Sequence, residues 1–396
     1  MALPRLRWFA AAAAAFVLLI VHARPYLMGL SFVVRAADMR GPARRVADIG
    51  LRRATEQSID ISTRHGSLHG RLYWPDSRVR RTALLVSGLH PAGIDEPRLG
   101  HLARELAESG VAVVTPDIPA LSHFTITPDI TDDIEDAAVW LAGLPSTRAG
   151  DGRVGLMGIS FSGVLAIVAA GRATLRDRVA YVFSFGGHDD LPRVLRYLCT
   201  GVEPPHPREV SFDRGPARAV ARPPHDYGVA VILAGVAERV VPRQQVQPLR
   251  AAVLRFLWAS HLDRVDKPQA EREFAALREL AKRLPEPSAT LLAYVNGRDV
   301  VHLGARLLPF VGAYGGAAAL SPSKSSKPSA PIFLLHGTDD NVIPAVESEY
   351  TADDLRGHAP VRLLLSGLIS HAEADQPVRA GDVLALAGFW ADLLRR

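Results

Sequence analysis

Four short, almost wholly apolar runs recur in the first half of the chain, with amphipathic helical segments between them. The runs are Thr82–Val86, Val111–Val114, Val154–Met157 and Val179–Phe185. Strands that are apolar on both sides belong in a sheet that is buried on both faces. Because such strands alternate with helices, the sequence predicts an α/β fold in which helices wrap both faces of a parallel sheet.

The sheet pattern starts earlier in the chain and resumes near its end. Residues 58–63 alternate apolar and polar side chains, and residues 68–74 return after a turn, which predicts an antiparallel hairpin. Two more apolar strands are expected at 331–335 and 361–365, and a last helix at 383–394. The hairpin and the late strands therefore extend the same central sheet.

Residues 191–328 interrupt this pattern. They contain proline-rich loops and amphipathic helices but no comparable strand, and Ser321–Ser329 has the composition of a flexible linker. We therefore expect a core in two parts with a large helical insertion between them. The expected segments are a signal-anchor or signal peptide (1–24), a linker or helical lead-in (25–55), the first part of the core (56–190), the helical cap insertion (191–328) and the second part of the core (329–396).

The N-terminus carries a targeting signal. Arg5 and Arg7 precede an unbroken apolar run, Trp8–Val21, which is shorter than a helix that spans a bilayer but fits the apolar part of a secretory signal. Apolar residues resume at Tyr26–Val34, which favours an uncleaved signal-anchor over a cleaved signal, and a buried N-terminal helix is the third interpretation. The arginines before the run place the rest of the chain on the extracytoplasmic side, in the periplasm or at the cell exterior.

Composition excludes several classes of function. The net charge of +5 is modest for 396 residues and no block of like charge is present, so nucleic acid is not an expected partner. The single cysteine, Cys199, can form neither an internal disulfide nor a cysteine-based metal site. Hydrophobic residues make up 48% of the chain, as in a globular protein.

The sequence Met-Gly-Ile-Ser-Phe-Ser-Gly at residues 157–163 joins a buried strand to an apolar helix. A sharp strand-to-helix turn pushes the serine side chain out of the sheet, and small residues two positions away on either side allow the backbone to turn so tightly. Ser160 is therefore the candidate nucleophile. The second small residue is Ser162, in place of glycine, and Ser162 is the competing nucleophile.

Candidates for an acid and a base follow the late strands. Residues 336–344 read His-Gly-Thr-Asp-Asp-Asn-Val-Ile-Pro, and His371 lies beyond the last expected strand. We expect His371 to take the proton of Ser160, while Asp340 orients the imidazole and stabilises its positive charge. The rival acids are Asp339, Asp189 and Asp190, and His336 is interpreted as structural.

These motifs resemble the α/β-hydrolase superfamily, in particular its esterase and dienelactone-hydrolase-like branches. The resemblance covers residues 56–190 and 329–396 and includes the order serine, acid, histidine. It implies a mostly parallel eight-stranded sheet with helices on both faces, a helical cap, no metal and no cofactor. By position in this fold, the backbone N–H groups of Leu89 and Phe161 would form the oxyanion hole.

Two further histidines are candidate pocket residues. His90 either adds a hydrogen bond to the pocket or caps the following turn, and His188 is a pocket-wall or structural residue. The expected function is hydrolysis of a carboxylic ester, or a related acyl bond, of a small-molecule substrate through an acyl-enzyme on Ser160. An acyltransferase on the same triad and a non-catalytic binding protein on a hydrolase fold are the alternatives.

Overall fold

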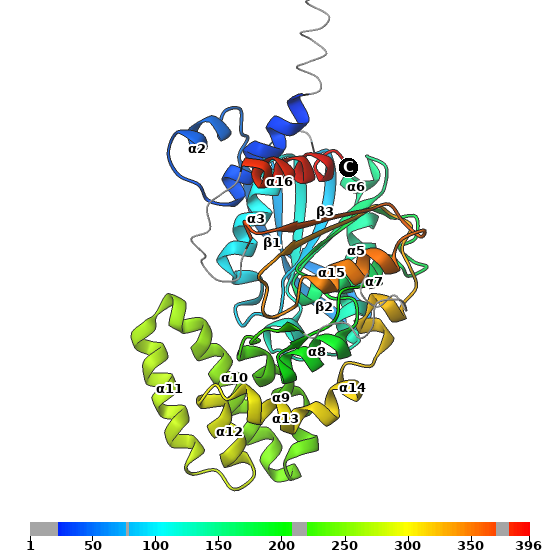
Figure 1. Cartoon of the computed structure of the whole chain (residues 1–396). Coiled ribbons are helices and arrows are strands. Elements are labelled where there is room, and N and C mark those ends of the chain that lie inside the picture. Colours follow the sequence, from blue (N-terminus) through cyan, green and yellow to red (C-terminus); the bar gives the residue numbers. More distant parts are fainter. Residues whose placement is uncertain (1–22, 77–78, 208–219, 370–379) are drawn as a thin grey trace, which may run out of the picture.

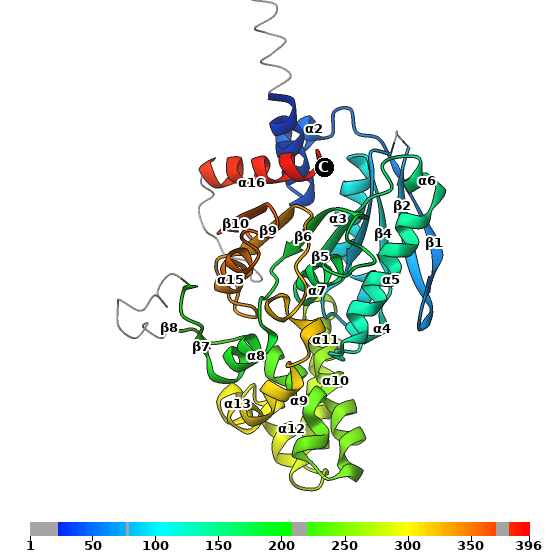
Figure 2. The ribbon, with the colours of Figure 1, turned by 90° about the vertical axis from the view of Figure 1, so that its right-hand side faces the viewer.

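A computed structural model describes residues 23–76, 79–207, 220–369 and 380–396. Its centre is a sheet of eight strands in the order β1-β2-β4-β3-β5-β6-β9-β10 (Figures 1 and 2). The strands are β1 (Ala54–Thr63), β2 (Gly66–Pro75), β3 (Arg81–Val86), β4 (Val111–Pro116), β5 (Val154–Ile159), β6 (Val179–Phe185), β9 (Ile332–Gly337) and β10 (Val361–Ser366).

Most neighbouring strands of this sheet run parallel. β2 pairs antiparallel with both β1 and β4, and every other pairing in the sheet is parallel. Parallel neighbours need a crossover between them, and helices supply it. The predicted α/β architecture, a mostly parallel eight-stranded sheet with helices on both faces, is confirmed.

Successive side chains of each strand enter two different cores, because a strand has a period of two residues. Leu84 and Val86 pack on one side of the sheet, while Ala83 and Leu85 pack on the other. The first side is covered by α5 (Asp129–Gly143), α7 (Phe161–Ala170) and α15 (Val346–Asp354). The second side is covered by helix 23–36, α3 (Pro97–Glu108) and α16 (Ala380–Leu393).

Helix 23–36 is part of the folded domain. Its Phe32 ring lies 4.4 Å from that of Trp390 in α16, and Gly29 packs so closely on the α16 backbone that a Cβ would not fit. Arg35 forms a buried ion pair with Glu105 of α3 at 2.6 Å. The apolar residues after Pro25 are thus explained by packing. No helix in the described ranges is long and apolar enough to cross a membrane, and residues 1–22 of the predicted anchor lie outside those ranges.

The insertion is helical and continues the first core. Side chains of α9 and α10 share one apolar cluster with those of α7 and the strands. Its elements are α8 (Leu191–Thr200), β7 (Val202–Glu203), β8 (Val220–Ala221), α9 (Tyr227–Val240), α10 (Arg243–Val265), α11 (Lys267–Ala281), α12 (Ser288–Asn296), α13 (Val300–Leu307) and α14 (Val311–Tyr314). The short antiparallel ribbon of β7 and β8 has no counterpart in the sequence prediction.

The local prediction for residues 321–329 was wrong. The expected flexible linker is docked on the core, because Ser321 Oγ accepts from the Leu191 N–H and Ser323 Oγ donates to the Asp189 carbonyl. Composition suggested a loose segment, but these serine hydroxyls have specific backbone partners.

Candidate active site

Ser160 lies on a sharp turn between β5 and α7. Its φ of 55° and ψ of −127° fall in a region that non-glycine residues rarely adopt. Glycines make the turn possible, because a Cβ on Gly158 would strike the Ser162 backbone and one on Gly163 would lie 2.5 Å from Ser184 Oγ. The strained serine stands at the N-terminus of α7, whose unpaired N–H groups favour developing negative charge.

Ser162 has a different role. Its side chain is fully buried, its Oγ lies 2.6 Å from the Ser87 carbonyl, and it accepts from the Ile159 N–H at 3.2 Å. The hydroxyl therefore ties the turn to the end of β3. This explains the departure from the Gly-x-Ser-x-Gly pattern and leaves Ser160 as the better placed nucleophile.

The loop after β3 lies directly against the nucleophile. A Cβ on Gly88 would lie 3.3 Å from the Cβ of Ser160, so a side chain there would crowd the nucleophile. Next to it, the Leu89 N–H has no hydrogen-bond partner within the described part of the chain, and the same holds for the Phe161 N–H. Gly88 thus brings the loop that contains Leu89 next to Ser160, and Phe161 follows Ser160 in the chain.

Asp340 is held at the end of β9. Its side chain is buried, and Oδ1 accepts from the N–H groups of Val342 at 2.8 Å and Ile343 at 3.0 Å. A Cβ on Gly186 would lie 3.5 Å from Oδ2, and the Phe185 carbonyl just before it accepts from the Ser160 N–H at 2.6 Å. The carboxylate and the nucleophile therefore lie at the same edge of the sheet, beyond the ends of β9 and β5, and β6 lies between these two strands.

The neighbouring acid and histidine are placed differently. Asp339 is largely exposed and pairs with Arg222 at 3.8 Å, so it does not share the buried position of Asp340. His336 is fully buried between Ser348 Oγ at 2.6 Å and the Ile343 carbonyl at 2.9 Å, and it supports the loop that holds Asp340. The predicted base, His371, lies outside the described residues.

The rival acids after β6 belong to an ion cluster. Asp190 accepts from the Arg193 N–H and so caps α8, and it also pairs with Lys324 at 2.7 Å. Asp189 pairs with Arg193 at 3.2 Å, and Arg193 in turn pairs with the fully buried Glu347 at 2.6 Å. Burial raises the pKa of Asp189 to about 6. These carboxylates hold the start of the insertion on the core.

The two pocket histidines have defined contacts. His90 Nδ1 accepts from the Ala92 N–H at 3.2 Å, which is the turn-capping alternative, and burial lowers its pKa to about 4. His188 is fully buried, stacks on Phe161 with ring centroids 5.6 Å apart, and its Nε2 lies 2.9 Å from the Leu320 carbonyl. Burial also lowers the pKa of His188, so both rings are neutral near pH 7.

Contacts between the insertion and the site loops were not predicted from the sequence. The Tyr227 hydroxyl of α9 donates to the Leu89 carbonyl at 3.2 Å. The Asn341 carbonyl, next to the acid, accepts from the His225 N–H at 2.9 Å and from the Tyr197 hydroxyl at 3.3 Å. Hydrogen bonds between a side chain and a distant carbonyl leave no spacing pattern in a sequence, which is why these residues were missed.

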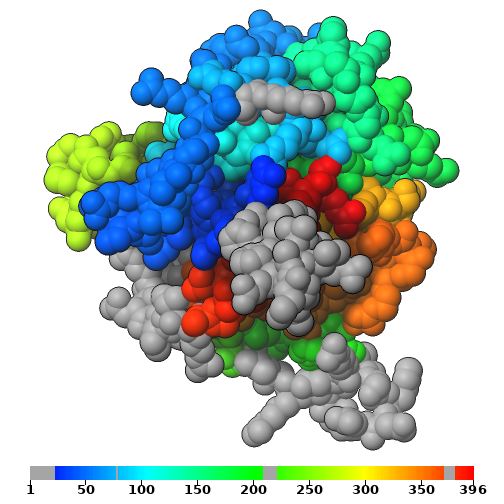
Figure 3. All heavy atoms as spheres, turned by 90° about the horizontal axis from the view of Figure 1, so that it is seen from above, coloured from blue at the N-terminus to red at the C-terminus, as the bar shows by residue number. Residues whose placement is uncertain are grey.

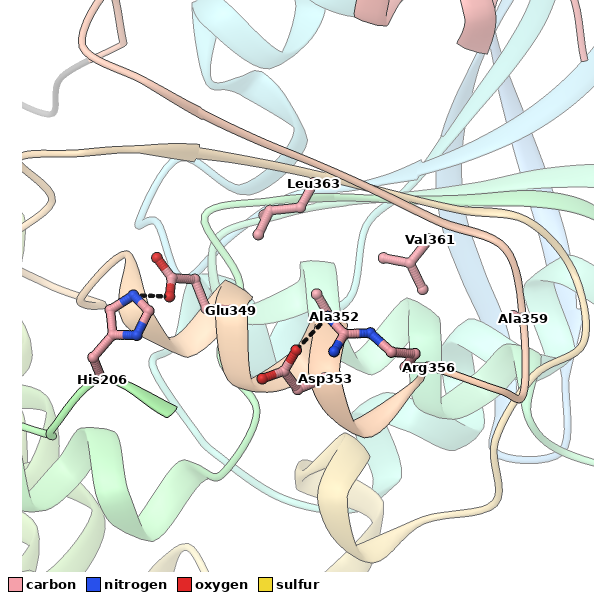
Figure 4. Close-up of a pocket in the computed structure, with 8 residues that line it drawn as sticks. All are labelled: His206, Glu349, Ala352, Asp353, Arg356, Ala359, Val361 and Leu363. Carbon is pink, nitrogen blue, oxygen red and sulfur yellow. Dashed lines mark ion pairs between the residues drawn. The ribbon is translucent and has the colours of Figure 1, made fainter. Parts of the chain in front are cut away.

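A separate pocket of about 400 Å³ opens at the edge of the sheet between α15 and β10 (Figure 4). Ion pairs between His206 and Glu349 and between Asp353 and Arg356 border it. Neither Ser160 nor Asp340 lines it. This pocket is therefore not the predicted catalytic centre.

Comparison with solved structures finds similar architectures at low sequence identity. A hyperthermophilic esterase from Pyrobaculum calidifontis is 16% identical and aligns over 95% of this chain and 92% of its own, with a TM-score of 0.44. A dienelactone hydrolase from Anabaena variabilis is 15% identical over 86% and 96%, with a TM-score of 0.40. An acetyl xylan esterase from a Thermoanaerobacterium species is 14% identical over 86% and 84%, with a TM-score of 0.39. No family model matches the chain, and neither does any curated protein.

Proposed function

We propose that this chain is a serine hydrolase that cleaves a carboxylic ester, or a related acyl bond, through an acyl-enzyme on Ser160. The strained backbone of Ser160 carries the proposal. A positive φ at a non-glycine residue costs energy and persists where the surrounding structure enforces it, most often at functional sites. Here Gly158 and Gly163 allow the close backbone packing around the turn, and the N–H groups of Leu89 and Phe161, which we propose as the oxyanion hole, have no partner in the described part of the chain.

In the proposed reaction, Ser160 Oγ attacks the acyl carbon and His371 accepts its proton. The N–H groups of Leu89 and Phe161 stabilise the oxyanion, and each such donor is typically worth about 3 kcal/mol. The alcohol leaves with the proton from His371, and the acyl group stays on Ser160. Water then attacks the acyl-enzyme, and His371 takes a proton from the water and passes it to Ser160 Oγ. The carboxylic acid is released and Ser160 is restored. Asp340 orients the imidazole throughout.

Labelling of the full chain with a fluorophosphonate, together with hydrolysis of p-nitrophenyl esters of increasing chain length, tests this function. Wild type labels and turns over, whereas Ser160→Ala does neither. Ser58→Ala, which changes an exposed serine of β1, keeps labelling and serves as the matched control. A wild type that neither labels nor hydrolyses any ester contradicts the proposal. Preferential acyl transfer to an added alcohol would identify a transferase instead.

We further propose that residues 1–24 anchor the chain in a membrane, with the catalytic domain on the extracytoplasmic side. The basic start at Arg5 and Arg7 and the apolar run Trp8–Val21 support this orientation. Mass spectrometry of the N-terminus in the membrane fraction, with protease treatment of spheroplasts, is the test. Loss of the segment, or protection of the domain from added protease, contradicts the proposal.

A further inference from the structure

Exposed apolar side chains gather at one end of the molecule. Helix 23–36, α2 (Pro42–Ala47) and α16 all reach the face seen in Figure 3, which we call the basal face. Six of the ten large apolar side chains that are exposed in the described ranges belong to residues 23–53 or to α16. They are Tyr26, Leu27, Met39, Val46, Ile49 and Leu384. A soluble surface rarely concentrates such side chains without a partner.

A pocket of about 250 Å³ opens where helix 23–36 meets α16. Its lining combines three arginines with four apolar residues. They are Arg24, Arg80 and Arg395, and Pro25, Met28, Ala391 and Leu394. A lining that combines guanidinium groups with apolar side chains suits an amphiphile that carries both an anionic group and hydrocarbon.

Several arginines of this face have no carboxylate partner in the described ranges, although Arg44 of α2 pairs with Asp38, Asp48 and Glu105. Arg395 pairs with Asp392, but Arg24 and Arg80 form no ion pair with any described residue. Arg40 and Arg45, both exposed on the segment around α2, likewise have no carboxylate partner in the described ranges. Guanidinium groups left without a carboxylate can pair bidentately with phosphate.

We propose that the basal face docks the folded domain on a bilayer that contains anionic phospholipids, with a lipid phosphate in the pocket of Arg24, Arg80 and Arg395. This inference rests on the proposed membrane anchor and goes beyond it. The apolar run ends at Val21, and Arg24 already lines the pocket. Three residues span at most roughly 10 Å, so an anchor in the bilayer holds this face at its surface.

Docking of this kind fixes where the catalytic centre points. The insertion lies at the end of the molecule away from helix 23–36 and α16 (Figures 1 and 2), and Ser160 lies at the strand ends nearer to it. The site therefore faces the aqueous phase, and the substrate class is an ester that arrives from water.

Site-directed fluorescence quenching on the full chain in nanodiscs tests the docking. A fluorophore is placed at Ile49→Cys on the basal face or at Val301→Cys on the insertion, where the native side chains are 79% and 76% exposed. The background is Cys199→Ala, which removes the buried native thiol. The quencher is a nitroxide-labelled lipid, in phosphatidylcholine with or without phosphatidylglycerol.

The label at position 49 is expected to be quenched, more strongly with phosphatidylglycerol, and the label at 301 is not. Arg24→Gln with Arg80→Gln lowers the ratio of docked to undocked domain roughly fivefold for each arginine removed. Equal quenching at both positions, insensitivity to the anionic lipid, or a chain that does not enter the discs overturns the proposal. The proposal is also overturned if position 49 is shielded from a water-soluble quencher but is not quenched by the nitroxide-labelled lipid. That outcome would indicate a protein partner.

The same discs separate this proposal from the enzymatic one. Fluorophosphonate labelling of Ser160 is read on the same samples, and neither arginine lines the catalytic centre. Quenching without labelling would refute the hydrolase and leave the docking intact. Labelling without quenching would refute the docking and leave the hydrolase intact.

Discussion

The sheet and the helical insertion contribute to the candidate site in different ways. The sheet carries the proposed reacting groups, because Ser160 follows β5 directly and Gly88 and Asp340 lie in the loops after β3 and β9. The insertion supplies hydrogen bonds to backbone carbonyls of the same loops, through Tyr227 to Leu89 and through Tyr197 to Asn341. From this comparison we expect the sheet to determine whether the proposed chemistry occurs, and the insertion to adjust the position of the groups that perform it.

The two regions nevertheless share one apolar core. Val164 and Ile167 of α7 belong to the same cluster as Leu233 of α9 and Val253 of α10. A lid that moved as a rigid body would have to break this packing, at a cost that scales with the apolar area exposed. We therefore expect the insertion to contribute to the stability of the whole domain.

The strongest test on the side of the sheet is the acid. Asp340→Asn keeps the shape of the loop but removes the charge that stabilises an imidazolium, and kcat/KM is expected to fall about 10⁴-fold. Asp339→Asn is the matched control, because Asp339 is exposed and is expected to leave the rate within about twofold. Steady-state kinetics on a p-nitrophenyl ester measures both. Equal losses of kcat/KM in the two variants would mean that Asp340 is not the acid of the triad.

The next largest effect is expected on the ion pair that joins the regions. Glu347 of α15 is fully buried against Arg193 of α8 and also accepts from the Asp189 N–H at 2.9 Å. Glu347→Gln leaves the Arg193 guanidinium with Asp189 as its remaining charged partner in the described ranges and should lower the free energy of unfolding by about 3 kcal/mol. Urea denaturation of wild type and Glu347→Gln measures this difference in the free energy of unfolding.

The exposed pair of Glu279 with Lys282 provides the control for that experiment. Glu279→Gln is expected to leave the denaturation midpoint unchanged, because water screens this pair. Fluorophosphonate labelling of folded Glu347→Gln should persist. A Glu347→Gln chain as stable as wild type would mean that the two regions are held together by apolar packing alone.

Asp189 predicts how the junction depends on pH. Burial raises its pKa from 3.8 to about 6, so the folded state holds its proton more tightly than the unfolded chain. Its contribution to stability is therefore present below pH 3.8 and is lost as the pH rises through 6, a change of up to about 3 kcal/mol. Asp189→Asn removes this change, which urea midpoints between pH 4 and 8 measure. If the urea midpoints of wild type and Asp189→Asn differ by the same amount at every pH, Asp189 does not make stability depend on pH.

The sequence predicted the strands and the nucleophile turn of the sheet better than the contacts between the sheet and the insertion. Strand runs such as Val154–Met157 and the turn at Ser160 depend on local periodicity and on glycines, so the alternating fold and the nucleophile turn were readable. The roles of Ser162, Tyr227 and Glu347 depend on partners far away in the chain, and periodicity carries no information about them. The serine-rich segment 321–329 was misread for the same reason, since its hydroxyls bind backbone atoms of Asp189 and Leu191 that composition does not reveal.

The smallest predicted effect decides whether the insertion adjusts the chemistry at all. Tyr227→Phe removes only the hydroxyl that donates to the Leu89 carbonyl, and burial raises the pKa of Tyr227, so the hydroxyl stays a donor at working pH. One neutral hydrogen bond is worth about 1 kcal/mol, which corresponds to a roughly fivefold loss of kcat if it positions the Leu89 backbone for the oxyanion. Tyr294→Phe is the control, because its hydroxyl has no partner within the described part of the insertion. A loss of stability with unchanged kcat would make Tyr227 a packing residue only, and the chemistry would then belong to the sheet alone.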